Sequence, residues 1–318
     1  MKGKKIAILG ATSHIAKGLI YNFLQSGEFA LHLYIRWSEK MDQVRQFLKA
    51  IKKTAARSCV IHKGYNDFLK CSCDVVINCI GVGTISKLEG DYTKYFTVTE
   101  EYDNLVINYL KKHPKSLYIS FSSGAIYGRE FSKPANENTA NCIRVNHIIP
   151  EDYYSIARLN AEAKHRAFKN LNIVDLRLFS YFSRFADLKD DYFIIEIIKC
   201  ILKKKIFKTD KSDILRDYIH PQDLFLAIKK CIEIGKINGS FDINSKKPAN
   251  KWEILGYFVS AYGLKYKIVP SLNFTSATGL KNKYYSAYNN ATKLGFKPRF
   301  SSLDTIKEES KYILKNII

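Results

Sequence analysis

The chain has 318 residues, 46% of them hydrophobic, which is enough for one large core or two unequal domains and excludes a disordered protein. Its net charge of +21 comes from lysines in short runs along the whole chain, so we attribute it first to composition, second to attraction for an anionic ligand and last to nucleic acid. No apolar run reaches the ~20 residues of a bilayer helix and no signal peptide is visible, so we expect a cytoplasmic protein with no membrane partner. The seven cysteines include no Cys-x-x-Cys pair, so we expect reduced thiols and no metal site.

The first element is a short apolar run at residues 4–9, which predicts a buried strand. A glycine turn comes next and opens a helix that runs to about residue 24. A strand, a glycine turn and a helix are typical of dinucleotide-binding folds, because backbone N–H groups and the helix N-terminus then face a pyrophosphate. The glycine pattern is incomplete, since it reads Gly10-x-x-Ser13-x-x-Ala16, so an ordinary strand–helix turn is the alternative. The cofactor-binding residues expected in this turn are Gly10, Thr12, Ser13, His14 and Ile15.

The second strand is predicted at residues 29–35, and the residues after it bear on the choice of cofactor. A carboxylate at that place would bind the adenosine ribose and repel a 2′-phosphate. This chain has Arg36, with Ser38 and Lys40 close behind, and arginine makes bidentate contacts with phosphate. We therefore expect NADPH, with NADH or NAD as the second choice. The alternative is that Arg36 is an ordinary surface residue.

Alternating strands and helices continue to about residue 180 and predict a Rossmann-type, doubly wound α/β sheet. Its further strands are expected at 59–62, 74–81, 116–121 and 173–179, with helices at 41–53 and 92–112. Two strands end in turns that offer ligand-binding groups at the same sheet edge, Cys79-Ile80-Gly81 and Ser122-Ser123.

Beyond residue 180 the alternation breaks, and a helix at 192–202 with short strands indicates a smaller α/β substrate-binding lobe. We divide the chain into a dinucleotide-binding domain at 1–180, with segments around 210–230, and a substrate lobe at 181–318.

A further helix is predicted to start near Asp152, which would cap it, with Ile156, Leu159 and Ala163 on one face. Tyr154 and Arg158 are four residues apart and therefore share a face of this helix. A fixed cation one turn from a phenol favours the phenolate and suits the phenol for acid–base work. An ordinary amphipathic helix with a surface tyrosine and arginine is the alternative.

Several motifs then come one after another in a specific order from residue 4 to about 300. They are Gly10-x-x-Ser13-x-x-Ala16, Asp74-Val75-Val76-Ile77, Ser122-Ser123-Gly124-Ala125-Ile126-Tyr127-Gly128, Tyr154-x-x-x-Arg158-Leu159-x-Ala161-Glu162, Leu176-Arg177-Leu178-Phe179, Arg216-Asp217-Tyr218-Ile219-His220-Pro221-x-Asp223-Leu224 and Ala291-Thr292-Lys293-Leu294-Gly295-Phe296-x-Pro298. Together they resemble the extended branch of the short-chain dehydrogenase/reductase superfamily, the NAD-dependent epimerases and dehydratases that act on nucleotide-activated sugars.

The resemblance implies a role for each matched residue. Ser123 and Tyr154 would hydrogen-bond the C4 oxygen of the sugar, with Tyr154 as the general acid or base. Arg158 would bind the nicotinamide ribose, although the family usually has lysine there. Arg216 would grip the substrate diphosphate, and Ser180 stands where an asparagine often contacts the substrate. Asp217 and His220 are interpreted as structural, and the resemblance also implies a homodimer through the helices at 92–112 and 152–170.

The two residues after Ser123 narrow the choice of reaction. Dehydratases of this family have an acidic pair there, and this chain has Gly124 and Ala125, so we disfavour dehydration. We expect NADPH-dependent reduction of the C4 keto group of a nucleotide-diphosphate 4-keto-6-deoxy sugar, a hexose or a heptose, for a surface polysaccharide such as capsule or lipopolysaccharide. The alternatives are an NAD-dependent 4-epimerase or 4-oxidase and, from another class, a non-catalytic NAD(P)-binding sensor or scaffold.

Overall fold

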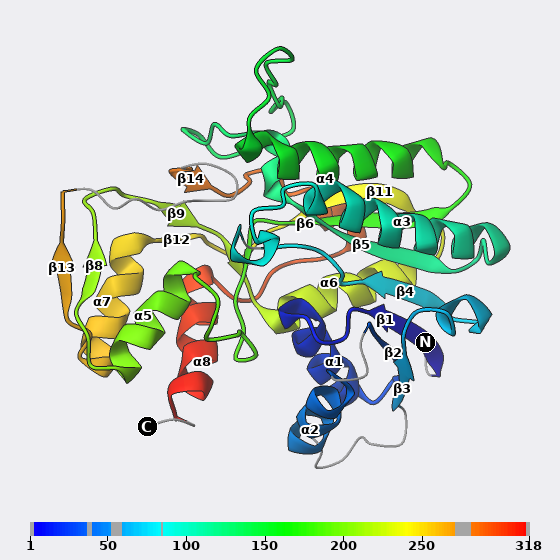
Figure 1. The fold of residues 1–318 in the computed structure, drawn as a ribbon, viewed down its shortest axis with the longest axis horizontal. Coiled ribbons are helices and arrows are strands. Elements are labelled where there is room, and N and C mark those ends of the chain that lie inside the picture. Colours follow the sequence, from blue (N-terminus) through cyan, green and yellow to red (C-terminus); the bar gives the residue numbers. More distant parts are fainter. Residues whose placement is uncertain (1–2, 37–39, 52–58, 84, 271–280, 316–318) are drawn as a thin grey trace.

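The computed structural model describes residues 3–36, 40–51, 59–83, 85–270 and 281–315. A sheet of seven parallel strands with helices on both faces forms its centre, which confirms the predicted doubly wound α/β fold (Figure 1). The strands lie in the order β11-β6-β5-β4-β1-β2-β3. Their bounds are β1 Lys4–Leu9, β2 Phe29–Ile35, β3 Cys59–Lys63, β4 Val75–Asn78, β5 Leu117–Ser123, β6 Asn172–Leu178 and β11 Asn238–Ile243.

Strand β1 shows why the apolar runs of this sequence become central strands. Ile6 and Ile8 pack into the core on one face of the sheet, Ala7 and Leu9 into the core on the other, and all four are fully buried. A strand covered on both faces needs a continuous apolar run instead of an alternating one. The strand order reverses at β1, which pairs with β2 on one side and β4 on the other. In such sheets, ligands bind outside the carboxyl ends of the strands at this switch point.

The two faces of the sheet are covered by different helices (Figure 1). One face carries α1, α2 and α6, and the other carries α3 and α4. Their bounds are α1 His14–Ser26, α2 Met41–Ile51, α3 Lys94–Lys112, α4 Pro150–Ala167 and α6 Pro221–Ile234. Short 3-10 turns connect these elements, and they are η3 Phe68–Lys70, η4 Ile85–Leu88, η5 Gly124–Tyr127 and η6 Asn290–Leu294.

The second lobe lies beside the carboxyl edge of the sheet (Figure 1). It holds α5 Phe193–Leu202, α7 Lys251–Tyr262 and α8 Ser302–Lys315, which share a core of their own, together with the paired strands β8 Phe207–Thr209 and β13 Tyr266–Ile268. A small sheet of β12 Ala249–Asn250, β9 Leu215–Arg216 and β14 Lys283–Tyr284 and the pair β7 Ser180–Tyr181 and β10 Tyr218–Ile219 complete it. The division of the chain at residue 180 stays a prediction. Strand β11 of the central sheet and helix α6, which covers one face of the sheet, both come from the part of the chain after residue 180. In the described ranges, no helix is long and apolar enough to cross a bilayer.

The structure corrects the predicted start and the predicted apolar face of α4. The helix begins at Pro150, two residues earlier than predicted, and Asp152 caps it from the first turn, where its carboxylate accepts the Ile149 N–H at 3.2 Å. Proline suits the first helical position because its missing N–H would have no partner there. The predicted apolar face is also wrong, since Leu159 is 39% exposed and Ala163 is exposed as well. The buried face instead carries small and hydrogen-bonded polar side chains, which are Asp152, Ser155, Ala157, Ala161, Glu162 and His165.

Candidate active site

The turn after β1 packs tightly against the turn after β4. Gly10 has a φ of +71°, and a Cβ there would lie 2.9 Å from Cγ1 of Ile80 and 3.2 Å from the carbonyl carbon of Cys79. Only glycine meets both the left-handed conformation and this close approach. The structure thus brings Gly10, Cys79 and Ile80 together at the carboxyl edge of the sheet, as the predicted cofactor site requires. Burial raises the pKa of the Cys79 thiol, so it stays protonated.

Ser13 gives a physical reason for the departure from the glycine pattern. Its hydroxyl accepts the Ala16 N–H at 3.2 Å and so caps the N-terminus of α1. A close contact of α1 with a neighbouring segment occurs instead at Gly18, where a Cβ would collide with the Tyr181 hydroxyl. The incomplete motif therefore still yields a tight turn and a well-formed helix start.

The neighbouring turn residues lie at the same place. Thr12, His14 and Ile15 are half-buried. The His14 ring meets Tyr181 edge-on at 4.9 Å, and burial lowers the His14 pKa to about 4, so the imidazole is neutral. Among the described residues its Nε2 has no hydrogen-bond partner. This leaves an unused polar atom at the expected cofactor turn.

Arg158 reaches from α4 across the carboxyl end of β5 to the turn after β4. One guanidinium nitrogen donates to the Phe121 carbonyl at 3.1 Å, and another lies 2.7 Å from where a Cβ of Gly81 would be. The missing side chain of Gly81 therefore makes room for the larger arginine in place of the family's lysine. Within the described chain the buried Nε of Arg158 has no partner, which fits a site that holds a polar ligand such as a dinucleotide ribose.

Tyr154 lies one turn before Arg158, and the guanidinium carbon is 5.3 Å from the centre of the phenol ring. The Tyr154 ring also meets the ring of Tyr95 of α3 edge-on at 5.2 Å. A tyrosine held by contacts with a cation and a second ring has little freedom to move. The predicted tyrosine–arginine pair is thus present on a single helix face.

Ser123 ends β5 and is buried. Its hydroxyl oxygen lies 3.1 Å from the hydroxyl oxygen of Tyr284 and accepts the Ala125 N–H at 3.2 Å. Burial raises the pKa of Tyr284 above its usual range, and the nearby Tyr154 phenol raises it further. Tyr284 therefore stays protonated, and its hydroxyl group lies beside that of Ser123.

Tyr284 and Lys281 are site residues that the sequence analysis missed. Tyr284 pairs in register with Arg216 across β14 and β9, and the Arg216 guanidinium donates to the Lys281 carbonyl at 2.6 Å. The Lys281 side chain lies over the rings of Phe131 and Tyr284, at 4.8 and 4.5 Å. No sequence pattern pointed to them, because a two-residue strand reaches the site only through long-range pairing.

Buried Lys281 and half-buried Arg216 form a pair of cations. Lys281 is 3% exposed, and burial together with the Arg216 charge lowers its pKa to about 7. Burial lowers the pKa of Arg216 as well. Across the described part of the chain, neither cation has a carboxylate within ion-pair distance. Two desolvated cations without an acid favour an anionic ligand between them.

Two further predicted ligand residues, Arg36 and Ser180, are among those that the structure describes. Arg36 is exposed directly after β2, and its charge acts on Tyr65, whose phenol reaches the Gly10 backbone. Ser38 lies outside the described residues. Ser180 is half-buried in β7 and pairs in register with Tyr218 of β10.

Other motif residues brace the fold. Ser122 donates to Glu162 at 2.5 Å, and the Arg177 guanidinium binds both oxygens of the same carboxylate. Asp217 accepts the Ser245 N–H at 2.9 Å, and burial raises the Asp217 pKa to about 6. These contacts link strands and helices behind the site, so the motif carries both structural and ligand-facing residues.

His220, Glu308 and Glu309 bring three possible metal ligands together. His220 accepts the Gln222 N–H through Nδ1 at 3.1 Å, so its neutral ring carries the proton on Nε2 and offers no lone pair to a metal. Glu309 is already bound by the Arg184 guanidinium and backbone N–H. This cluster joins α6, α8 and the segment after β7, which supports a structural role for His220.

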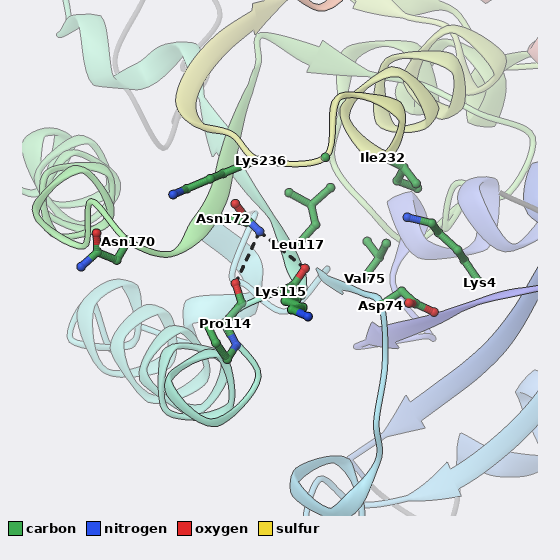
Figure 2. A pocket seen from close by; sticks show the side chains of 11 residues that line it. Lys4, Asp74, Val75, Pro114, Lys115, Leu117, Asn170, Asn172, Ile232 and Lys236 are labelled. Atoms are coloured by element: carbon green, nitrogen blue, oxygen red, sulfur yellow. Dashed lines mark hydrogen bonds between the residues drawn. The ribbon is translucent and has the colours of Figure 1, made fainter.

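The hollow drawn in Figure 2 lies at the opposite edge of the sheet, where the strands begin. It has a volume of about 370 Å³, and Asn172 on its wall donates to the carbonyls of Pro114 and Lys115 at 3.5 Å. Lys4, Asp74 and Lys236 also line it. None of the predicted site residues lies there, so we place the active site at the carboxyl edge.

The comparisons with known proteins agree with this architecture. A search of curated proteins finds no sequence match. Among solved structures, the chain is similar to a UDP-N-acetylglucosamine 4-epimerase from Methanobrevibacter ruminantium, with a TM-score of 0.79, 18% identity, and coverage of 99% of this chain and 100% of that one. It is also similar to a UDP-glucose 4-epimerase from Stenotrophomonas maltophila, with a TM-score of 0.81, 14% identity, and coverage of 98% of each chain. A dTDP-glucose 4,6-dehydratase from Bacillus anthracis is similar with a TM-score of 0.76, 15% identity, and coverage of 98% of this chain and 97% of that one. At these identities the likeness shows the fold. The sequence model of the NAD dependent epimerase/dehydratase family matches residues 6–243, and the chain therefore belongs to that family.

Proposed function

We propose that the protein is an NADPH-dependent reductase of the C4 keto group of a nucleotide-diphosphate 4-keto-6-deoxy sugar, a hexose or a heptose of a surface polysaccharide. The observation that carries the proposal is the buried pair of hydroxyl groups of Ser123 and Tyr284, 3.1 Å apart at the end of β5, a strand that packs against the helix carrying Tyr154 and Arg158. Such hydroxyl groups can bind a carbonyl oxygen and deliver a proton to it.

Different side chains would polarise the C4 carbonyl and donate the proton to it. The bound cofactor would supply the hydride. Ser123 donates a hydrogen bond to the C4 oxygen and polarises the carbonyl, while Tyr154 donates the proton that the reduced oxygen needs. Arg158 balances the charge that Tyr154 acquires on losing this proton, and its free Nε is available to the nicotinamide ribose.

The packing around Gly124 supports reduction over dehydration. A Cβ at Gly124 would overlap the ring of Phe179. The position that carries an acid in the dehydratases of the family therefore has no space for any side chain here. Without that acid, elimination of water from the sugar lacks its proton donor.

Charge at the two ends of the site supports the choice of ligands. Arg216 and Lys281 are placed to hold the diphosphate of the substrate. Arg36 is exposed directly after β2, and its charge acts on Tyr65 beside the Gly10 backbone. This cation supports a cofactor with a 2′-phosphate.

An NAD-dependent 4-epimerase is the second candidate, because two of the similar solved structures are 4-epimerases. An epimerase returns its hydride and consumes no cofactor, whereas a reductase oxidises one NADPH per product formed.

The variant Tyr154→Phe tests catalysis against a non-catalytic cofactor sensor. We expect turnover to fall by about 10²–10⁴-fold, because the general acid is gone, while NADPH affinity measured by fluorescence stays within about twofold. Tyr153→Phe, on the same helix, is the matched control. Full activity of Tyr154→Phe would refute the assignment.

A further inference from the structure

Two cysteines that the sequence analysis treats as scattered thiols lie side by side under the sheet. The sulfur atoms of Cys71 and Cys73 are 3.1 Å apart in the segment that leads into β4. Cys71 is half-buried, whereas Cys73 is 3% exposed. Only one residue separates them, and neither lies in a helix or strand. The Cys73 backbone is held by hydrogen bonds to Tyr109 and Ser116, so the two sulfurs stay in contact.

A histidine pair stands next to the more accessible thiol. Nδ1 of His32 lies 3.8 Å from the Cys71 sulfur and 3.0 Å from Nε2 of His62. Tyr34 stacks on the His62 ring at 4.5 Å and holds it in place. The two histidines come from β2 and β3, whereas the cysteines come from the segment before β4, so folding brings the four together.

The protonation states of these groups suit thiol chemistry. Burial lowers the pKa values of both His32 and His62, so these rings are neutral and able to accept a proton. Burial, and then the hydrogen bond to Cys71, raise the pKa of Cys73, which stays a thiol. Cys71 therefore has a base on one side and a protonated thiol on the other, which is the arrangement of an attacking and a resolving cysteine.

We propose that Cys71 and Cys73 form a dithiol that a hydroperoxide oxidises to a disulfide, with Cys71 attacking first. His32 takes the Cys71 proton, and the thiolate attacks a peroxide oxygen. The O–O bond breaks, Cys71 becomes a sulfenic acid, and the leaving alkoxide takes the proton. The Cys73 sulfur then attacks the Cys71 sulfur, the S–O bond breaks, and the hydroxyl leaves as water with the Cys73 proton. The two sulfurs lose two electrons, and the products are the disulfide, one alcohol (water if the oxidant is hydrogen peroxide) and one water.

The cysteine pair precedes β4 and lies toward the amino edge of the sheet, and a backbone hydrogen bond of Tyr34 connects its surroundings to the cofactor turn. The backbone carbonyl of Tyr34, whose ring holds His62, accepts the Ala11 N–H at 3.2 Å, directly after Gly10. The four groups contact one another in a chain from His62 to Cys73, not around a central point, which favours proton transfer and disulfide formation over metal binding.

The experiment exposes the reduced full-length protein to hydrogen peroxide, blocks remaining thiols with N-ethylmaleimide, and follows each cysteine by peptide mass spectrometry. Cys142 serves as the comparator within the same chain, because it is more exposed but belongs to another segment. We expect a Cys71–Cys73 disulfide that forms at least about tenfold faster than Cys142 is oxidised, since His32 lies beside the Cys71 sulfur and the Cys73 sulfur lies 3.1 Å away to resolve the sulfenic acid.

Two variants test the order of the steps. Cys73→Ser should stop at a sulfenic acid on Cys71 that dimedone traps, and His32→Gln should slow the oxidation of Cys71 by about tenfold. The proposal is overturned if Cys142 reacts first in the wild-type protein, if the two sulfurs never pair, or if the protein is purified with a zinc ion that protects both thiols.

Discussion

Lys281 carries a charge that depends on pH near neutrality, because burial and Arg216 lower its pKa to about 7. The ammonium form dominates below this pKa and the neutral amine above it. A diphosphate held by Arg216 and Lys281 should therefore bind best below about pH 7 and more weakly as the pH rises. We expect KM for the nucleotide sugar to increase above neutral pH in the wild-type protein.

Replacing the lysine tests this dependence. Lys281→Met should raise KM at low pH and flatten its pH profile, with kcat changed much less. Lys283→Met, an exposed lysine two residues away, should behave as the wild type does. Steady-state kinetics across about pH 6 to 9 give the answer, and a profile that Lys281→Met leaves unchanged would remove Lys281 from the substrate site.

We propose that Tyr284 acts through the hydroxyl of Ser123, which it contacts at 3.1 Å. Tyr284→Phe removes this partner and leaves the buried Ser123 hydroxyl less well oriented. We expect kcat to fall by about ten- to a hundredfold, with little change in cofactor affinity. Tyr285→Phe is the matched control. An unchanged kcat in Tyr284→Phe would show that Tyr284 only packs.

At the scale of elements, the β1–α1 turn depends on the absence of a side chain at Gly10. Gly10→Ala introduces a Cβ at positive φ and against the Cys79 carbonyl and the Ile80 side chain, whereas Gly27→Ala introduces one at a φ of +64° with no atom within 4 Å. Both should lose about 1 kcal/mol of stability from the backbone conformation, and only Gly10→Ala should also lose cofactor affinity. Thermal unfolding and NADPH titration separate the two effects; equal cofactor affinity in both variants would contradict the role of this turn.

Some helices, strands and site residues could be predicted from the sequence, and others could not. The central strands could be predicted because both faces of the sheet are buried, so each strand is a continuous apolar run, as in β1. Tyr154 and Arg158 could be paired because helix geometry fixes their spacing. The buried face of α4 was missed, because Glu162 and His165 are buried through hydrogen bonds to distant residues that the sequence does not display. Tyr284 and Lys281 were missed because tertiary pairing with β9, and no local pattern, brings β14 to the site.

The whole molecule is proposed to be a homodimer through α3 and α4. Leu159 is an exposed apolar residue of α4, so its side chain is available to pack on a partner subunit at the proposed interface. Leu159→Glu should yield monomers in light scattering, whereas Val259→Glu on α7, at the same exposure of 39%, should leave the assembly unchanged. A monomeric wild type, or a dimer that tolerates Leu159→Glu, would contradict this interface.

The central claim is that the protein consumes NADPH to reduce a C4 ketone. The most direct measurement supplies NADPH deuterated at the transferable position and a panel of nucleotide-diphosphate 4-keto-6-deoxy sugars, and analyses the product by mass spectrometry and NMR. We predict one NADPH oxidised per product, with deuterium at C4 and no tightly held nucleotide in the purified protein. Retained NAD, no net NADPH oxidation and interconversion of C4 epimers would contradict the account and assign the protein as a 4-epimerase.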